Sequence, residues 1–121
     1  MGSFQDLEVY QRAQKLFPQV HALVRRWSDL DQREIGGQLI RSANSIHANI
    51  AEGHGKSRAE FIRYIGIAIG SCDETRSHLQ DALNVGIIEN KVHEELLREY
   101  IIVGKQLMRL KQALRKPETR N

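Results

Sequence analysis

The sequence is poor in cysteine and proline: its 121 residues include one cysteine and two prolines. A disulfide or a cysteine-based zinc site needs several cysteines, so Cys72 alone excludes both within one chain. No stretch approaches the 18 consecutive apolar residues of a membrane-spanning helix, and the first residues lack the charged-then-apolar layout of a signal peptide. We therefore expect a cytoplasmic protein in a reducing environment with no membrane partner.

An excess of one charge is also nearly absent, because 18 Lys and Arg residues face 15 Asp and Glu residues, a net charge of +3. The apolar share of 40% and charged share of 27% are those of a globular protein and argue against disorder. We expect one domain over residues 1–121, with the last few residues as a loose tail. The charge is uneven: residues 105–121 hold six basic residues and one acidic residue, leaving the rest at −2.

What the sequence does have is a 3.6-residue apolar period throughout, without the sustained alternation of a β-strand. Four helical stretches follow, at about residues 5–27, 31–53, 57–84 and 90–115. Short connections make consecutive helices antiparallel neighbours. The predicted fold class is all-α, an up-down-up-down antiparallel four-helix bundle.

Capping residues mark where three of these helices begin. A Ser or Asp followed three residues later by an acidic residue satisfies free amides of the first turn. The pairs are Ser3 with Asp6, Asp31 with Glu34, and Ser57 with Glu60.

Proline and glycine mark the breaks. Pro18 predicts a kink in the first helix, because it removes one backbone hydrogen bond and crowds a carbonyl. Gly86 supplies the left-handed residue that stops the third helix, and Pro117 prevents the fourth from continuing.

Signals for enzymatic activity are weak. Gly55-Lys56-Ser57 resembles the end of a phosphate-binding loop, but the required earlier glycine is Ile50 and the preceding element is a predicted helix. No histidine has a glutamate three residues before it, as a carboxylate-bridged di-metal bundle would require. We expect no catalytic residues, no cofactor and no metal site. Glu74 and His78 lie one turn apart, and a bundle that binds a metal or a small molecule through them is a less favoured alternative.

The second predicted helix carries polar residues along one edge of its apolar stripe, and the third offers polar residues at similar spacing. These are Ser42, Ser45, Asn49 and Glu52 on the former, and Ser71, Glu74 and Ser77 on the latter. Polar groups at a core border need partners. A structural polar seam that sets the helix register is the main interpretation, and a ligand site is the alternative.

The fourth predicted helix has two adjacent apolar stripes that together cover about half of its circumference, wider than one core needs. The excess favours a homo-oligomer, with a deep groove closed by other helices as the alternative.

On its opposite side, five basic residues fall within about 40° of one another: Lys91, Arg98, Lys105, Arg109 and Lys116. With Lys111 and Arg115 they form the candidate nucleic-acid-binding set, suited to backbone phosphates without sequence preference. A solvated helix face is the alternative.

Residues 4–13, 41–57 and 67–74, with Gly86-Ile87-Ile88, resemble the 23S rRNA intervening-sequence proteins, which include accessory variability proteins of diversity-generating retroelements. The most specific run is Ser45-Ile46-x-x-Asn49-Ile50-Ala51-Glu52-Gly53. The signature positions of the family are matched by Ser45, Asn49, Glu52, Gly53, Ser71 and Glu74. Cys72 stands where the family has Leu, and Lys56 where Arg is common.

The resemblance implies an up-down bundle that assembles into a ring-like pentamer with a basic surface. For the accessory branch it further implies binding of nucleic acid and of a reverse transcriptase. The working hypothesis is a non-enzymatic, pentameric bundle that binds RNA or DNA backbone. The alternative is a scaffold that docks a reverse transcriptase or another enzyme.

Overall fold

The computed structural model describes residues 2–117 and contains only helices and their connections over that range. The tail expected at the end of the chain lies outside the described residues. Four long helices form the bundle: α1 (Glu8–Arg25), α3 (Gly37–His54), α4 (Arg58–Asn84) and α5 (Asn90–Arg115). Three short elements accompany them: a 3-10 turn at Phe4–Asp6, α2 at Asp29–Asp31 and a π-helical turn at Gln32–Gly36. The predicted all-α four-helix class is confirmed.

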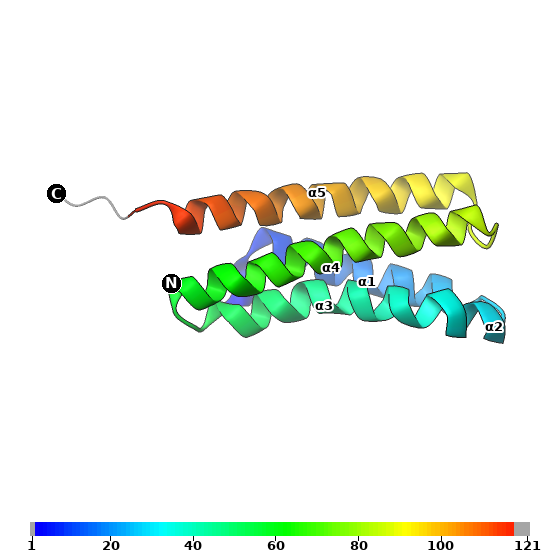
Figure 1. The fold of residues 1–121 in the computed structure, drawn as a ribbon, viewed down its shortest axis with the longest axis horizontal. Helices are drawn as coiled ribbons and strands as arrows, with labels where there is room; N and C mark the ends of the chain where they lie inside the picture. Colours follow the sequence, from blue (N-terminus) through cyan, green and yellow to red (C-terminus); the bar gives the residue numbers. More distant parts are fainter. Residues whose placement is uncertain (1, 118–121) are drawn as a thin grey trace.

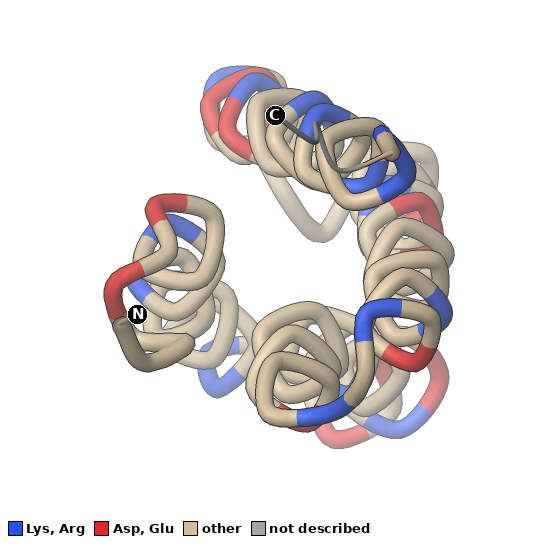
Figure 2. Tube along the Cα trace, turned by 90° about the vertical axis from the view of Figure 1, so that its left-hand side faces the viewer, with Lys and Arg blue, Asp and Glu red and all other residues tan. Residues whose placement is uncertain are grey.

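The long helices lie along a common direction (Figure 1). Seen from the end, they surround one axis in the order α1, α3, α4, α5, and the widest separation of neighbouring tubes is between α1 and α5 (Figure 2). The helices α4 and α5 run antiparallel, because the connection between them is short. The start of α4 therefore lies at the same end of the bundle as the end of α5 (Figure 1).

The capping predictions are confirmed in part. Ser3 and Asp6 form a reciprocal capping box on the first turn. The pair Asp31 and Glu34 is wrong as a start signal, because helical structure already begins at Asp29 and Ser28 accepts the Asp31 amide at 3.1 Å. A serine oxygen three residues upstream satisfies that amide, so Asp31 itself becomes helical.

At the start of α4, Ser57 caps the Glu60 amide at 3.2 Å as predicted. The Glu60 carboxylate does not complete the box; it instead accepts a hydrogen bond from Arg63 at 3.1 Å. The end of α4 agrees with the prediction, because Gly86 has φ +81° and the amides of Gly86 and Ile87 bond back to Leu83 and Ala82. This is the Schellman pattern that a glycine at this place permits.

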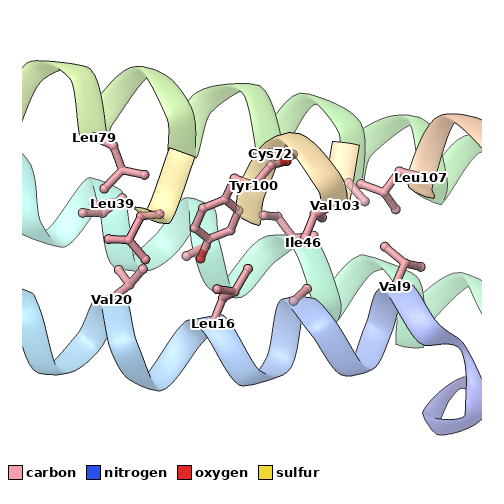
Figure 3. Packing of buried hydrophobic residues seen from close by; sticks show 14 of the residues in the cluster. Val9, Leu16, Val20, Leu39, Ile46, Cys72, Leu79, Tyr100, Val103 and Leu107 are labelled. Atoms are coloured by element: carbon pink, nitrogen blue, oxygen red, sulfur yellow. The ribbon is translucent and has the colours of Figure 1, made fainter. Parts of the chain in front are cut away.

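All four long helices contribute to one apolar core, in which Val20, Leu39, Ile46, Val103 and Leu107 are fully buried (Figure 3). The helix α1 is continuous through the exposed Pro18. The π-helical turn before α3 approaches α1 closely, since a Cβ atom on Gly36 would lie 2.5 Å from Val24 Cγ1. Burial lowers the pKa of the core histidine His47, so its ring is neutral near pH 7.

Candidate nucleic-acid interface

The charge of α5 changes sign along its length. Its first part together with the preceding cap residue Glu89, residues 89–99, holds four glutamates and two basic residues. Its last part together with the following cap residue Lys116, residues 105–116, holds five basic residues and no acidic one. The difference is visible from the end of the bundle, where blue predominates on the near part of α5 and red accompanies blue on the far part (Figure 2). The five basic residues are Lys105, Arg109, Lys111, Arg115 and Lys116.

The basic half of α5 is mostly exposed to solvent. Lys105, Arg109, Arg115 and Lys116 are exposed, and none of them forms an ion pair with another residue in the range 2–117. The side chain of Lys111 instead points toward α4, since its Nζ would lie 3.8 Å from a Cβ atom added to Gly66 of that helix. The cations therefore extend from the outer face of α5 onto its border with α4.

The start of α4 adds three further cations to this end of the bundle. Arg58 donates a hydrogen bond to the carbonyl oxygen of Lys116 at 3.1 Å, which joins the two helix ends. Lys56 and Arg63 lie over the ring of Tyr64, at 5.8 Å and 4.5 Å from its centroid. We call these residues together the basic end: Lys56, Arg58, Arg63, Lys105, Arg109, Lys111, Arg115 and Lys116.

Sequence reasoning missed the contribution of α4 because its cations are about 50 positions away from those of α5 in the chain. The usable signal was antiparallel pairing, which places the start of one helix beside the end of the next. Two of the added cations are matched by carboxylates: Lys56 lies 3.4 Å from Glu52, and Arg63 lies 3.1 Å from Glu60. The basic half of α5 thus carries most of the uncompensated charge.

Lys91 and Arg98, the remaining candidates, are exposed on the same side of α5 but among its glutamates. At 1.5 Å per residue, Lys91 is about 21 Å from Lys105 along the helix axis. The structure thus brings five of the seven candidates together and separates two of them.

The predicted polar seam lies between α3 and α4. Ser71 donates a hydrogen bond to the Ser45 hydroxyl at 2.8 Å, and Asn49 donates to the same hydroxyl at 2.8 Å. One turn away the buried Thr75 hydroxyl lies 2.9 Å from that of Ser42. The bonds of Ser71 with Ser45 and of Thr75 with Ser42 join α4 to α3 and so set the register of the two helices, whereas Asn49 holds the Ser45 hydroxyl from within α3.

Gly53 closes this seam at its end. A Cβ atom there would lie 2.6 Å from Tyr64 Cβ and 3.1 Å from Phe61 Cδ1. Only glycine lets the helices approach this closely. Three of the six signature positions, Ser45, Gly53 and Ser71, therefore act in packing α3 against α4, and a fourth, Asn49, bonds to Ser45 within α3.

The other two signature positions, Glu52 and Glu74, are exposed. Glu74 lines a polar hollow of about 420 Å³ over the seam together with His78 and Arg41. Ser77, which the sequence placed in the seam, is exposed instead. Thr75 takes that role and was missed, because a lone threonine in an apolar stripe has no distinctive signal. Over residues 2–117 no group of three or more His, Cys, Asp or Glu side chains is arranged to hold a metal.

Cys72 is buried in the core, and its Sγ lies 3.2 Å from the carbonyl oxygen of Tyr100. Burial raises the pKa of the thiol to about 11, so the reactive thiolate is not populated near pH 7. The tripeptide Gly55-Lys56-Ser57 forms the turn between α3 and α4 and the cap of α4. Neither feature is arranged as a catalytic site.

Several apolar side chains remain accessible on the single chain. Met108 of α5 is 44% exposed and Ile67 of α4 is 41% exposed, while Leu97 and Ile101 are half-buried.

None of the helices described is both long enough and apolar enough to cross a membrane.

This architecture defines a four-helix bundle with a hydroxyl-bonded seam and one basic end, and its fold is also found in solved structures. A crystal structure of a protein of unknown function from the S23 ribosomal protein family of Bacteroides thetaiotaomicron VPI-5482 superposes with a TM-score of 0.80. It is 24% identical, and the match covers 86% of this chain and 95% of that one. At this identity the likeness establishes the fold.

A family model described as 23S rRNA-intervening sequence protein matches residues 5–109. The chain therefore belongs to the family of 23S rRNA-intervening sequence proteins. No match was found among curated proteins.

Proposed function

We propose that this protein is a non-enzymatic homo-oligomer that binds the backbone of RNA or DNA through its basic end. The observation that carries the proposal is the run of five cations without an acidic residue over residues 105–116. Cations that neutralise phosphates release counterions, which gives affinity without reading the sequence. The family description refers to 23S rRNA, a polyanion of this kind.

Stabilisation of the helix end does not account for this run. A cation interacts with the helix dipole within the last turn, which here includes Arg115. Lys105 and Arg109 lie about ten and six residues before the end of α5, beyond that range. The helix dipole therefore does not explain Lys105 and Arg109, which supports a role for them in binding phosphate groups.

Assembly would bring several basic ends together and so strengthen binding. The exposed Met108 and Ile67 support a homo-oligomer, because apolar surface of this kind is removed from water when copies pack. A pentamer is the favoured assembly by resemblance to the family. Sedimentation of the free protein tests this, and a monomer at micromolar concentration would contradict it.

The binding test compares two double variants within one row of α5. Lys105→Gln with Arg109→Gln removes two charges from the basic half, and Lys91→Gln with Arg98→Gln removes the same two charge types from the acidic half. Binding of a labelled mixed-sequence RNA and DNA is measured by fluorescence anisotropy at several salt concentrations. The first variant should lose about tenfold in affinity at low salt and lower the salt slope by about two.

The second variant should change affinity by less than about twofold, because neighbouring glutamates already offset its cations. Equal losses in both variants, or binding that does not weaken with salt, would contradict the proposal. Absence of binding at low salt would leave the basic end to the alternative function, a scaffold that docks a reverse transcriptase or another enzyme.

A further inference from the structure

The polar hollow between α3 and α4 has the size of a small-molecule site. Its volume is about 420 Å³, within the range of about 300–1,000 Å³ that is usual for such sites. Ser42 and Ser71 are buried and Ser45 is half-buried, so these serines form its floor. We call it the α3–α4 hollow, and its rim consists of Gln38, Arg41, Glu74 and His78.

The floor of the hollow holds an unused hydrogen-bond donor. The hydroxyls of Ser45 and Ser71 carry one hydrogen each, and the 2.8 Å bond between them uses one of the two. Asn49 donates to Ser45 from its amide, and no acceptor within the range 2–117 receives the second hydroxyl hydrogen. A ligand with an acceptor oxygen can therefore bond to the floor without breaking the seam.

The rim of the hollow carries two opposite charges without a partner. Arg41 of α3 and Glu74 of α4 line the same hollow, yet neither forms an ion pair with another residue in the described part of the chain. A carboxylate on the ligand would meet the guanidinium of Arg41, and an ammonium group would meet the carboxylate of Glu74. The pair of charges therefore suits a ligand that carries both signs.

The composition of the lining excludes other classes of small ligand. No apolar or aromatic side chain lines the hollow, so a nucleobase or a lipid chain has no surface on which to stack or pack. A divalent metal needs several His or carboxylate ligands, and no group of three or more is arranged for one among residues 2–117. A simple anion such as phosphate is attracted by Arg41 but repelled by Glu74.

We infer that the α3–α4 hollow binds a free amino acid with a neutral polar side chain. The carboxylate of the amino acid lies beside Arg41 and accepts the unused hydroxyl hydrogen of the floor, while its ammonium group lies beside Glu74. The Gln38 amide nitrogen donates to the Glu34 carbonyl at 3.2 Å, so the Gln38 amide oxygen and the ring of His78 are left for the polar side chain.

This site is separate from the basic end. Glu74 lies about 16 Å along α4 from Arg63, the nearest cation of the basic end on that helix, at 1.5 Å per residue. The inference therefore does not depend on the function proposed for the basic end.

The test measures binding of L-serine, L-asparagine and L-glutamine to the full-length protein by isothermal titration calorimetry, at millimolar ligand concentration. Two analogues of the amino acid that binds best each lack one charge. The N-acetyl derivative lacks the ammonium group, and the α-carboxamide lacks the carboxylate. Inorganic phosphate is the control for a simple anion.

Two single variants remove the charges of the rim: Arg41→Gln and Glu74→Gln. Both side chains are exposed, so the variants should fold, and circular dichroism checks this. The matched controls remove the same charges from exposed positions of other helices, and they are Arg25→Gln on α1 and Glu94→Gln on α5.

The best amino acid should bind about tenfold more tightly than either analogue and than phosphate, because only the intact zwitterion meets both charges. Arg41→Gln should weaken its binding about fivefold and reduce the preference over the α-carboxamide, whereas Glu74→Gln should reduce the preference over the N-acetyl derivative. The two control variants should leave binding unchanged.

Three results would overturn the inference. The first is that none of the three amino acids binds, and the second is that an analogue or phosphate binds as tightly as the amino acid. The third is that the control variants lose as much affinity as the variants of the rim.

Discussion

Two borders of the same bundle are packed in opposite ways. Between α3 and α4, hydroxyl groups of Ser45 and Ser71 meet at 2.8 Å and Gly53 leaves no room for a side chain. Between α1 and α5, three hollows lie in a row. The 2.8 Å contact of Arg12 with Glu99 joins the two helices at the middle hollow. The comparison indicates that small residues at the α3–α4 border allow close packing, whereas long side chains at the α1–α5 border accompany a looser one.

Small residues explain the closed border. Ser, Thr and Gly allow the backbones to approach, and each hydroxyl finds a partner at the resulting distance. The α1–α5 border instead carries long side chains such as the exposed Lys15 and Gln19 and the half-buried Arg12, which bonds to Glu99. These side chains leave hollows between the two helices.

The largest effect is expected from filling the closed border. Gly53→Val should destabilise the fold by about 3 kcal/mol, because its side chain would overlap Tyr64 and Phe61 and must displace them. Urea unfolding followed by circular dichroism measures the loss.

The control for Gly53 is Gly70→Ala on α4, where nothing lies within 4 Å of the added Cβ atom. It should stabilise α4 by about 0.5–1 kcal/mol through helix propensity. Comparable losses at both positions would show that the α3–α4 border is not specially tight.

A smaller effect is expected from removing one hydroxyl of the same border. Thr75 is fully buried, and Thr75→Val removes its bond to the Ser42 hydroxyl, which keeps its own bond to the Leu39 carbonyl, so the cost should be about 1 kcal/mol. The double variant Ser42→Ala with Thr75→Val should cost less than the sum of the single variants. Strict additivity in unfolding experiments would mean that the two hydroxyls do not interact.

The smallest effect is expected at the open border. A double-mutant cycle of Arg12→Gln and Glu99→Gln should give a coupling of about 0.5 kcal/mol, because both side chains are partly exposed. The coupling should fall further at 1 M salt, where screening is short-ranged. A coupling above that of Thr75 with Ser42 would reverse the ranking of the two borders.

Much of this fold was predictable from local patterns. The apolar period placed the long helices, Gly86 marked the end of α4, and Ser42, Ser45 and Ser71 indicated a polar seam before any geometry was known. The errors have local causes: Ser28 caps the helix that Asp31 was expected to start, and a π-helical turn at Gln32–Gly36 has no simple sequence signal. Thr75 was overlooked because its contact with Ser42 depends on how α3 and α4 pack, which the sequence of α4 alone does not display.

The basic end was half predictable. Its cations on α5 follow one helical row, which the sequence displays directly. Those of α4 join them through the contact of Arg58 with the Lys116 carbonyl, and a contact over 58 positions depends on how the helices are stacked.

By itself, the sequence determined the helices, their order and the concentration of positive charge in the last part of the chain, because period, capping and charge are local properties. The tertiary structure decided which residues meet: it made Gly53 indispensable, brought α4 to the basic end and left α1 and α5 apart. The physical reason is that packing depends on the size and reach of side chains from two helices at once. That information is absent from either helix alone.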